Sequence, residues 1–220
     1  MPTLFIATGN GHKVQEIRAV LGTGFTVLSP ADATVKLEPE ETGATFAENA
    51  RIKSITWAAY LAADVCQLGA HYVLADDSGL EVDALGGAPG VHSARFAARD
   101  DGREGNSTDR ENNAKLLHLL AKIPTERRTA RFRCVLALTP VQPGSLPWEL
   151  AGGTRFFTGA CEGFIASGPS GGGGFGYDPL FVPQGYAVSF AELGAPVKNQ
   201  LSHRARALAQ LLSHFAPAAA

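Results

Sequence analysis

Apolar residues recur along this chain in two patterns of spacing, and each pattern predicts one kind of secondary-structure element. The apolar run at 3–7 has the length of a buried strand. Val14, Ile17 and Leu21 then recur at the spacing of one helix face. Residues 25–28 resemble a second strand. The chain is therefore predicted to begin with a strand, a turn, a helix and another strand.

Two capping boxes predict where longer helices begin. In such a box a threonine side chain accepts from the backbone three residues later, and a glutamate at that position reaches back to the threonine N–H. The pairs are Thr45 with Glu48, expected to open a helix over 46–63, and Thr108 with Glu111, expected to open one that carries the leucines between 116 and 120.

The middle of the chain predicts a strand that ends in an acidic turn. Residues 72–75 have the composition of a short strand, which would place Asp76-Asp77-Ser78-Gly79 at its carboxyl end. Residues 80–85 are expected to pair with this strand before the glycine- and proline-rich loop at 86–90.

The second half of the chain predicts long strands, loops and a final helix. Alternating β-branched and aromatic residues at 128–138 and 154–166 are typical of two long antiparallel strands. The expected remainder is a flexible turn at 140–153, a glycine-rich loop at 168–176 that is either mobile or able to approach a ligand closely, a last helix that carries apolar residues from Leu201 to Phe215, and a disordered tail at 216–220.

This order of elements predicts the fold class. Strands alternating with helices at the start, followed by long strands, favour an α/β fold with a mixed sheet. Ligands in such sheets gather beyond the carboxyl ends of strands. The turn at Thr8 and the pair at Asp76 are both expected at such ends, so they could share one cleft.

The net charge and the length of the chain limit the classes of partner that this protein could bind. The chain has 220 residues, of which 45% are hydrophobic, and a net charge of -2 from 19 basic and 21 acidic residues. A chain of this size can bury a sizeable core. Nucleic-acid and membrane-surface binders normally carry a basic face, so the near balance argues against both. A local basic pocket for a small anion remains compatible with it.

Cysteine usage and hydropathy indicate a cytoplasmic protein. Cys66, Cys134 and Cys161 are far apart and odd in number, which predicts buried free thiols rather than disulfides or a zinc site. The apolar segment at 3–7 is too short for a signal peptide. No apolar run approaches the length of a membrane span.

The first candidate site is the turn Thr8-Gly9-Asn10-Gly11-His12-Lys13 before the first helix. Glycines let backbone N–H groups approach an oxyanion, the helix N-terminus favours negative charge, and Lys13 adds a full positive charge. It is not a Walker loop, because the glycine-lysine-serine/threonine ending is absent. The alternative is an ordinary connection that binds nothing.

The second candidate is the acidic set Glu41, Asp76 and Asp77. Magnesium takes a few carboxylate oxygens, keeps several waters and completes its shell with substrate phosphates. Adjacent aspartates at a strand end point to opposite faces, so only one is expected to face the cleft. The alternatives are an ordinary turn at Asp76 and a solvated acidic loop at 38–41.

The third candidate is Gly173-Gly174-Phe175-Gly176-Tyr177-Asp178-Pro179. Two aromatic rings in so glycine-rich a segment have little to pack against locally, so we interpret them as partners of a base. A stacking ring beside a carboxylate that accepts from a base edge would suit a nucleotide. The alternative is a loop whose aromatic rings point inward.

The fourth candidate is Lys198 with Ser202, His203 and Arg204, expected at the start of the last helix. Lys198 and Arg204 could pair with phosphate oxygens, and His203 could donate to a carbonyl of the base. Cations are slightly unfavourable at a helix N-terminus, which favours an anionic partner over a solvated turn.

Together the four candidates resemble the inosine/xanthosine triphosphate pyrophosphatase family, which hydrolyses non-standard purine nucleotides. The motifs occur in order over nearly the whole chain. They are Ala7-Thr8-Gly9-Asn10 with Lys13, Glu41-Thr42-Gly43, Thr45-Phe46, Glu48-Asn49-Ala50, Ala75-Asp76-Asp77-Ser78-Gly79-Leu80, Gly86-Gly87-Ala88-Pro89-Gly90-Val91, Ser93-Ala94-Arg95, Gly174-Phe175-Gly176-Tyr177-Asp178-Pro179, Lys198 and Ser202-His203-Arg204.

The resemblance implies a fold, a reaction and an assembly. The fold would be one α/β domain over residues 1–220, with an elongated mixed sheet, flanking helices and two lobes around a central cleft. The reaction would be magnesium-dependent hydrolysis of ITP, dITP and XTP to the monophosphate and pyrophosphate. The protein would be a cytoplasmic homodimer that binds neither nucleic acid nor membrane.

The resemblance also implies roles by motif position. Asp77 would be the proton acceptor and a metal ligand, with Glu41 as the second metal ligand. The triphosphate would be held by Thr8, Gly9, Asn10, Gly11, His12, Lys13, Lys53 and Ser78, and the base by Phe175, Gly176, Tyr177, Asp178, Lys198, His203 and Arg204.

Two alternative functions differ from this one in testable ways. A pyrophosphatase for pyrimidine or methylated nucleotides would show another substrate profile. A nucleotide sensor without activity would not need Glu41 and Asp77 beside a metal.

Overall fold

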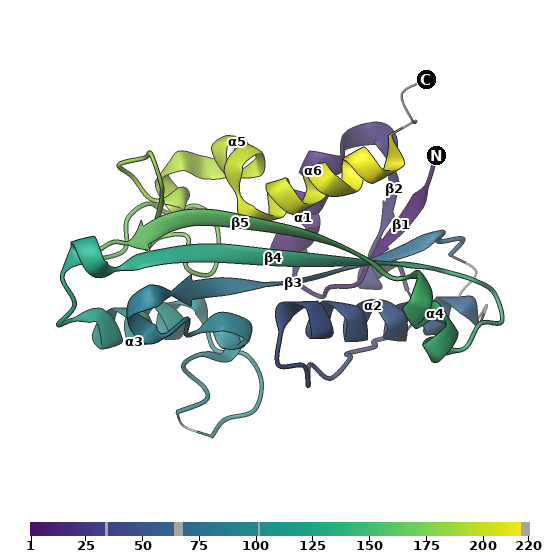
Figure 1. Ribbon diagram of the computed structural model, residues 1–220, viewed down its shortest axis with the longest axis horizontal. Helices are drawn as coiled ribbons and strands as arrows, with labels where there is room; N and C mark the ends of the chain where they lie inside the picture. Colours follow the sequence, from purple (N-terminus) through teal and green to yellow (C-terminus); the bar gives the residue numbers. More distant parts are fainter. Residues whose placement is uncertain (34, 64–67, 101, 217–220) are drawn as a thin grey trace. The chain divides into compact units, whose positions relative to one another are not determined.

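The structure is a computed structural model that describes residues 1–33, 35–63, 68–100 and 102–216 (Figure 1). Helices and strands follow one another as the α/β prediction requires. The strands are β1 (Thr3–Ile6), β2 (Thr26–Leu28), β3 (Tyr72–Val82), β4 (Thr129–Pro140), β5 (Arg155–Ile165) and β6 (Phe181–Pro183). The helices are α1 (Gly11–Leu21), α2 (Phe46–Ala62), α3 (Asp109–Leu120), α4 (Pro147–Gly153), α5 (Phe190–Leu201) and α6 (His203–Phe215), and the main 3₁₀ segment is η4 (Gly90–Arg95).

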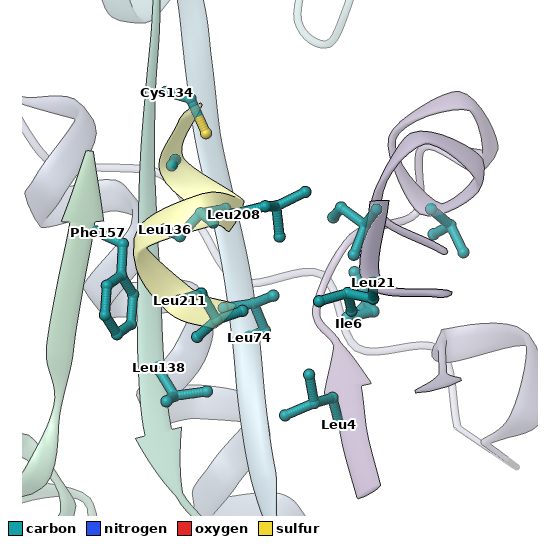
Figure 2. Packing of buried hydrophobic residues seen from close by; sticks show 13 residues of the cluster. Leu4, Ile6, Leu21, Leu74, Cys134, Leu136, Leu138, Phe157, Leu208 and Leu211 are labelled. Atoms are coloured by element: carbon teal, nitrogen blue, oxygen red, sulfur yellow. The ribbon is translucent and has the colours of Figure 1, made fainter. Parts of the chain in front are cut away.

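The strands form one mixed sheet in the order β2-β1-β3-β4-β5-β6. β1 pairs in parallel with β2 and with β3, whereas β5 and β6 are antiparallel. The arrows of β4 and β5, which carry Leu138 and Phe157, point in opposite directions in Figure 2. The predicted mixed sheet is confirmed.

The described residues fold as two compact units. The first unit comprises residues 1–77, 134–158 and the chain from 206 onward, and the second comprises 78–133 and 159–205. β3, β4 and β5 each contribute residues to both units. The arrangement of two lobes around a cleft stays a prediction.

Alternation on β1 divides the first unit into two apolar layers. Leu4 and Ile6 join a cluster with α1 and α6, in which Leu21 and Leu208 take part (Figure 2). The intervening Phe5 packs in a second cluster with residues of α2 and α4. Side chains of a strand alternate between faces, so helices cover the sheet on both sides.

The second unit has its own core. Leu80 and Val82 of β3 pack with Phe132 of β4 and with Leu116 and Leu120 of α3, and Phe181 and Phe190 complete the cluster. The capping boxes at Thr45 and Thr108 are both present, so the predicted starts of α2 and α3 are confirmed.

Three predicted elements are wrong in detail. Residues 72–82 form one continuous strand rather than two that pair with each other. The supposed flexible turn at 140–153 contains α4, because Leu150 is buried against the core. Leu201 belongs to α5, and Ser202, with an extended backbone, separates it from α6.

Three further predictions concern the cysteines, the C-terminal tail and membrane-spanning segments. Cys134 and Cys161 are buried free thiols, as predicted, while Cys66 lies outside the described residues. The predicted disordered tail also falls outside them, except for residue 216. None of the helices in the described parts of the chain combines the length and apolarity that crossing a bilayer requires.

Candidate active site

The turn after β1 is organised by Asn10, which caps α1. Its Oδ1 accepts from the backbone N–H of His12 at 2.9 Å and of Lys13 at 3.2 Å. The protein thus uses two of the first donors of the helix itself, and the positive charge of Lys13 becomes the stronger attraction for an anion. A Cβ added at Gly9 or Gly11 would meet nothing within 4 Å, so internal packing explains neither glycine.

Lys13 reaches from α1 to Asp76 on β3. Its Nζ lies 2.6 Å from Asp76 Oδ1. Asp76 is fully buried, and its second oxygen accepts from the Cys134 thiol at 3.2 Å. A buried carboxylate is costly unless it is paired, so Lys13 neutralises Asp76 and is held close to the turn in return.

Lys53 joins the two predicted metal ligands. Its Nζ, projecting from α2, donates to Asp77 Oδ1 at 2.8 Å and to Glu41 Oε1 at 3.0 Å. It also donates to the backbone carbonyl of Asp76 at 2.8 Å. An ammonium has three hydrogens, and all three have acceptors here. In the sequence, only the family resemblance pointed to Lys53.

Asp76 and Asp77 lie inside β3, not at its carboxyl end as predicted. Lysine partners make two adjacent charges tolerable within a strand. Because these lysines are distant in sequence, the local pattern resembled a turn. The prediction that they point to opposite faces agrees with their contacts, because Asp76 binds Lys13 and Asp77 binds Lys53.

Opposing effects act on the pKa of the Asp77 carboxyl. Burial raises its pKa above the ordinary value, and the positive charges of Lys53 and Lys13 offset this only in part. Burial lowers the pKa of Lys53, but the negative charges of Asp77 and Glu41 outweigh it and leave that pKa raised. The pair therefore favours a charged lysine beside a carboxylate that can take up a proton.

The donor chemistry at Asp77 fits a hard divalent cation. Asp77 Oδ2 is buried, and no described residue gives it a hydrogen bond. Glu41 supplies a second carboxylate through the shared lysine. Among the described residues no group of three or more His, Cys, Asp or Glu could hold a metal. An ion here would need phosphate or water oxygens as well, as magnesium usually does.

Asn49 supports the candidate site, and no pattern in the sequence assigned it a role. It is fully buried in α2, and its Oδ1 accepts from the backbone N–H of Gly43 at 2.8 Å. This bond ties the loop that carries Glu41 to the helix that carries Lys53. A buried asparagine in the first turn of a helix was the available signal, because a buried amide needs a specific partner.

Lys198 and Asp178 organise the aromatic loop of the second unit. The Lys198 ammonium donates to Asp178 Oδ2, and the same oxygen accepts from the backbone N–H of Phe175 at 2.8 Å. Both charged groups are buried. Lys198 Nζ also lies 4.3 Å from the centroid of the Phe175 ring, a cation–π contact. Asp178 therefore shapes the loop around Phe175.

Tyr177 is a core residue, which corrects the argument that the loop's rings have little to pack against. It is 4% exposed and belongs to the apolar cluster of the second unit. Its hydroxyl donates to the Ser93 carbonyl at 2.9 Å. Burial raises the pKa of Tyr177, and the negative charge of Asp109 adds to the effect. Phe175, by contrast, is only partly buried.

His203 and Arg204 begin α6 but are not solvated. Both are buried, and the His203 ring stacks on Phe132 with centroids 4.9 Å apart. Arg204 Nη2 donates to Ser78 Oγ at 2.9 Å, and its guanidinium lies 6.0 Å from the Phe175 centroid. Lys198 lies in α5, so the four residues do not share one helix start as predicted.

The predicted site residues thus form two clusters. The Lys53 cluster, in the first unit, contains residues 8–13, Glu41, Lys53, Asp76 and Asp77. The Phe175 cluster, in the second unit, contains Ser78, residues 175–178, Lys198, His203 and Arg204. Asp77 and Ser78 are consecutive on β3, so the chain itself links the two clusters.

Comparison with known proteins agrees over almost the full length. The profile of the Ham1 family matches residues 4–214. The dITP/XTP pyrophosphatase of Geobacter sulfurreducens is 46% identical over 217 residues, which cover 98% of this chain and 97% of that one. That of Pseudomonas syringae pv. tomato is 45% identical over 208 residues, 94% of each chain.

Solved structures agree as well. A HAM1 protein from Coxiella burnetii has a TM-score of 0.78 at 36% identity and covers 98% of both chains. The Staphylococcus aureus Ham1 protein has a TM-score of 0.76 at 35% identity and covers 97% of both. With its fold, its ordered motifs and these relatives in agreement, this chain belongs to the Ham1 family.

Proposed function

We propose that this protein hydrolyses the non-standard purine nucleotides ITP, dITP and XTP to the nucleoside monophosphate and pyrophosphate. The observation that carries the proposal is Lys53, whose ammonium binds both Glu41 and Asp77 while one buried Asp77 oxygen lacks a donor among the described residues. The names of the relatives, dITP/XTP pyrophosphatases, support the same reaction.

The Lys53 cluster suits the triphosphate end of the substrate. Lys13 and Lys53 supply two cations that are already fixed by carboxylates, so little reorganisation accompanies substrate binding. Gly9 and Gly11 leave open space at the turn, where phosphate oxygens could approach the backbone. Residues 8–13 and Lys53 of this cluster, together with Ser78 of the Phe175 cluster, are the proposed triphosphate contacts.

Glu41 and Asp77 are the proposed ligands of a magnesium ion. When bound, the ion would neutralise charge on the phosphates and on the departing pyrophosphate. Both ligands are hard carboxylate oxygens, which magnesium prefers. Lys53 keeps the two carboxylates together by binding both at once.

Asp77 is the proposed proton acceptor. A water oxygen forms the new bond to the α-phosphorus, the bond from that phosphorus to the bridging oxygen breaks, and pyrophosphate leaves with the bonding electrons. The proton lost by the water passes to the Asp77 carboxylate. Burial raises the pKa of this group, which makes it a better base than an exposed aspartate.

The Phe175 cluster suits the base. Phe175 offers a stacking surface, and His203, Arg204 and loop N–H groups are donors for the carbonyl at position 6 of hypoxanthine or xanthine. Adenine carries an amino group there, which would leave buried donors unpaired, so ATP should be rejected. Guanine shares the carbonyl, so its rejection must depend on position 2.

A nucleotide panel tests the proposal directly. Pyrophosphate release with magnesium should be fast for ITP, dITP and XTP, and at least about 100-fold slower for ATP. Asp77→Asn should lower kcat by at least about 100-fold with a far smaller change in KM, because general-base catalysis typically contributes that much. Equal rates for ITP and ATP, or a near wild-type kcat in Asp77→Asn, would contradict the assignment.

The family resemblance also favours a homodimer located in the cytoplasm. Sedimentation velocity at micromolar concentration should give one species of twice the chain mass of 23.0 kDa. A monomer under those conditions would contradict this part of the proposal.

A further inference from the structure

α3 holds both backbone polar groups of Gly176. Asp109 Oδ2 accepts from the Gly176 N–H at 2.6 Å, and Asn113 Nδ2 donates to the Gly176 carbonyl at 2.9 Å. Asp109 and Asn113 are four residues apart on the helix, so their side chains lie on the same face. Two side chains one turn apart on α3 therefore bind the backbone of a single residue of the aromatic loop.

The hydrogen bonds to Gly176 can fix the orientation of the neighbouring Phe175 ring. The φ of Gly176, +63°, lies in the left-handed region, which glycine adopts without strain. The Gly176 N–H belongs to the peptide plane that begins at Phe175. Fixing that N–H fixes the plane, and Asp178 holds the N–H on the other side of Phe175. Both peptide planes that flank the ring are thereby anchored.

Stability alone does not account for Asn113. Its Oδ1 is buried and receives no hydrogen bond within the described part of the chain. An unpaired buried amide oxygen costs free energy, so an apolar residue in its place would avoid a penalty. What the asparagine contributes is the donor that holds the Gly176 carbonyl.

Asp109 does not serve as the cap of α3 either. The capping box of this helix is formed by Thr108 and Glu111. The Asp109 carboxylate is directed instead at the loop, although its residue is exposed. Two side chains of α3 with no capping role thus converge on one glycine.

We propose that Asp109 and Asn113 are positioning residues for base recognition. Acting through Gly176, they hold the Phe175 ring beside Lys198 in the orientation on which the purine stacks. This inference rests on the proposed function and assigns it two further specificity residues. Neither side chain touches the reacting phosphates in this scheme, so both should act on binding of the base rather than on the chemical step.

Three variants at neighbouring positions test the role of Asp109. Asp109→Ala removes the acceptor, Asp109→Asn keeps an acceptor oxygen at the same place, and Arg110→Ala trims an exposed side chain on the same turn as a matched control. Asp109→Ala should raise KM for dITP about fivefold to tenfold, with kcat within about twofold of wild type. Asp109→Asn should restore most of the affinity, and Arg110→Ala should match wild type.

Product inhibition separates a positioning role from a general loss of structure. Pyrophosphate lacks the base, so its inhibition constant should be unchanged in Asp109→Ala, whereas that of dIMP should rise as much as KM does. Asn113→Ala should reproduce this pattern. An unchanged KM, a parallel loss of pyrophosphate affinity, or a lowered melting temperature without a KM effect would overturn the inference.

Failure of the inference and failure of the proposed function give different results. A wild-type protein that releases no pyrophosphate from dITP would overturn the proposed function, and this inference with it. An active wild type with an unaffected Asp109→Ala variant would overturn the inference alone.

Discussion

Lys53 is the residue on which most of the first cluster depends. It is 8% exposed, and its side chain meets two carboxylates and one carbonyl. Burying an ion pair seldom adds stability compared with an apolar pair of the same size, but removing one partner is severe because the other charge stays buried. An arrangement of this kind is therefore better explained by function than by stability.

Replacing Lys53 should show that dependence as a loss of stability. We expect Lys53→Met to lower the free energy of unfolding by about 3–5 kcal/mol at pH 7, because Asp77 then lacks its closest cation. Lys36→Met is the control, since Lys36 pairs with Glu38 on the exposed surface, and it should have no measurable effect. Urea denaturation of both variants measures the difference, and equal midpoints would contradict it.

The loss of stability in Lys53→Met should depend on pH. The pKa of Lys53 in the folded protein is raised above 10.5, because Asp77 and Glu41 outweigh the opposing effect of burial. Its stabilisation is therefore complete below pH 10.5 and is lost as the pH rises through the folded-state pKa. The gap between Lys53→Met and wild type should shrink in denaturation at strongly alkaline pH.

Glu41 should matter for the metal rather than for the fold. It is only partly buried, so Glu41→Gln should fold normally but need about tenfold more magnesium for half-maximal turnover. Glu40→Gln changes an exposed carboxylate one position earlier and should leave the magnesium requirement unchanged. A magnesium titration of pyrophosphate release compares them, and identical curves would exclude Glu41 as a ligand.

At the scale of elements, β3 explains how the two clusters are linked. It is one strand of eleven residues, in which Asp76 and Asp77 are followed directly by Ser78. The sequence predicted a turn at this point of the chain. Asp77 and Ser78, whose hydroxyl accepts from Arg204, are thus consecutive residues of one strand.

The pairing of β5 with β6 depends on a close backbone approach. A Cβ at Gly163 would overlap the Val182 carbonyl and the Phe181 ring, whereas one at Gly168 would meet nothing within 4 Å. Gly163→Ala should therefore cost about 1–3 kcal/mol of stability and Gly168→Ala much less. Thermal unfolding of the two variants checks this, and similar melting temperatures would show that the sheet relaxes freely.

At the scale of the whole molecule, the buried charges concentrate in the two clusters. Each unit has its own apolar core, so neither requires ion pairs to exclude water. Yet Lys53, Asp77, Asp178, Lys198 and Arg204 are all buried. Unpaired buried charges would be costly, and here each carries a partner. Departures from an apolar interior at a few places are typical of functional sites.

The sequence by itself determined the class of the fold and most of the candidate residues. The spacing of apolar residues and the capping boxes are local signals, because a helix start or a buried strand depends on residues a few positions apart. β1, β2, β4, β5, α1, α2 and α3 were predicted for this reason, whereas β6 was not predicted and β3 was expected as two shorter strands. The ordered motifs identified the family, because a match in that order over nearly the whole chain is not expected by chance.

Only the tertiary structure decided which side chains meet and in which environment. Asp76 and Asp77 looked like a turn because their partners, Lys13 and Lys53, are far away in sequence. The Tyr177 ring seemed to have little to pack against, whereas the folded chain buries it in the core of the second unit. Charge pairing and burial are properties of residues distant along the chain, so local pattern could not reveal them.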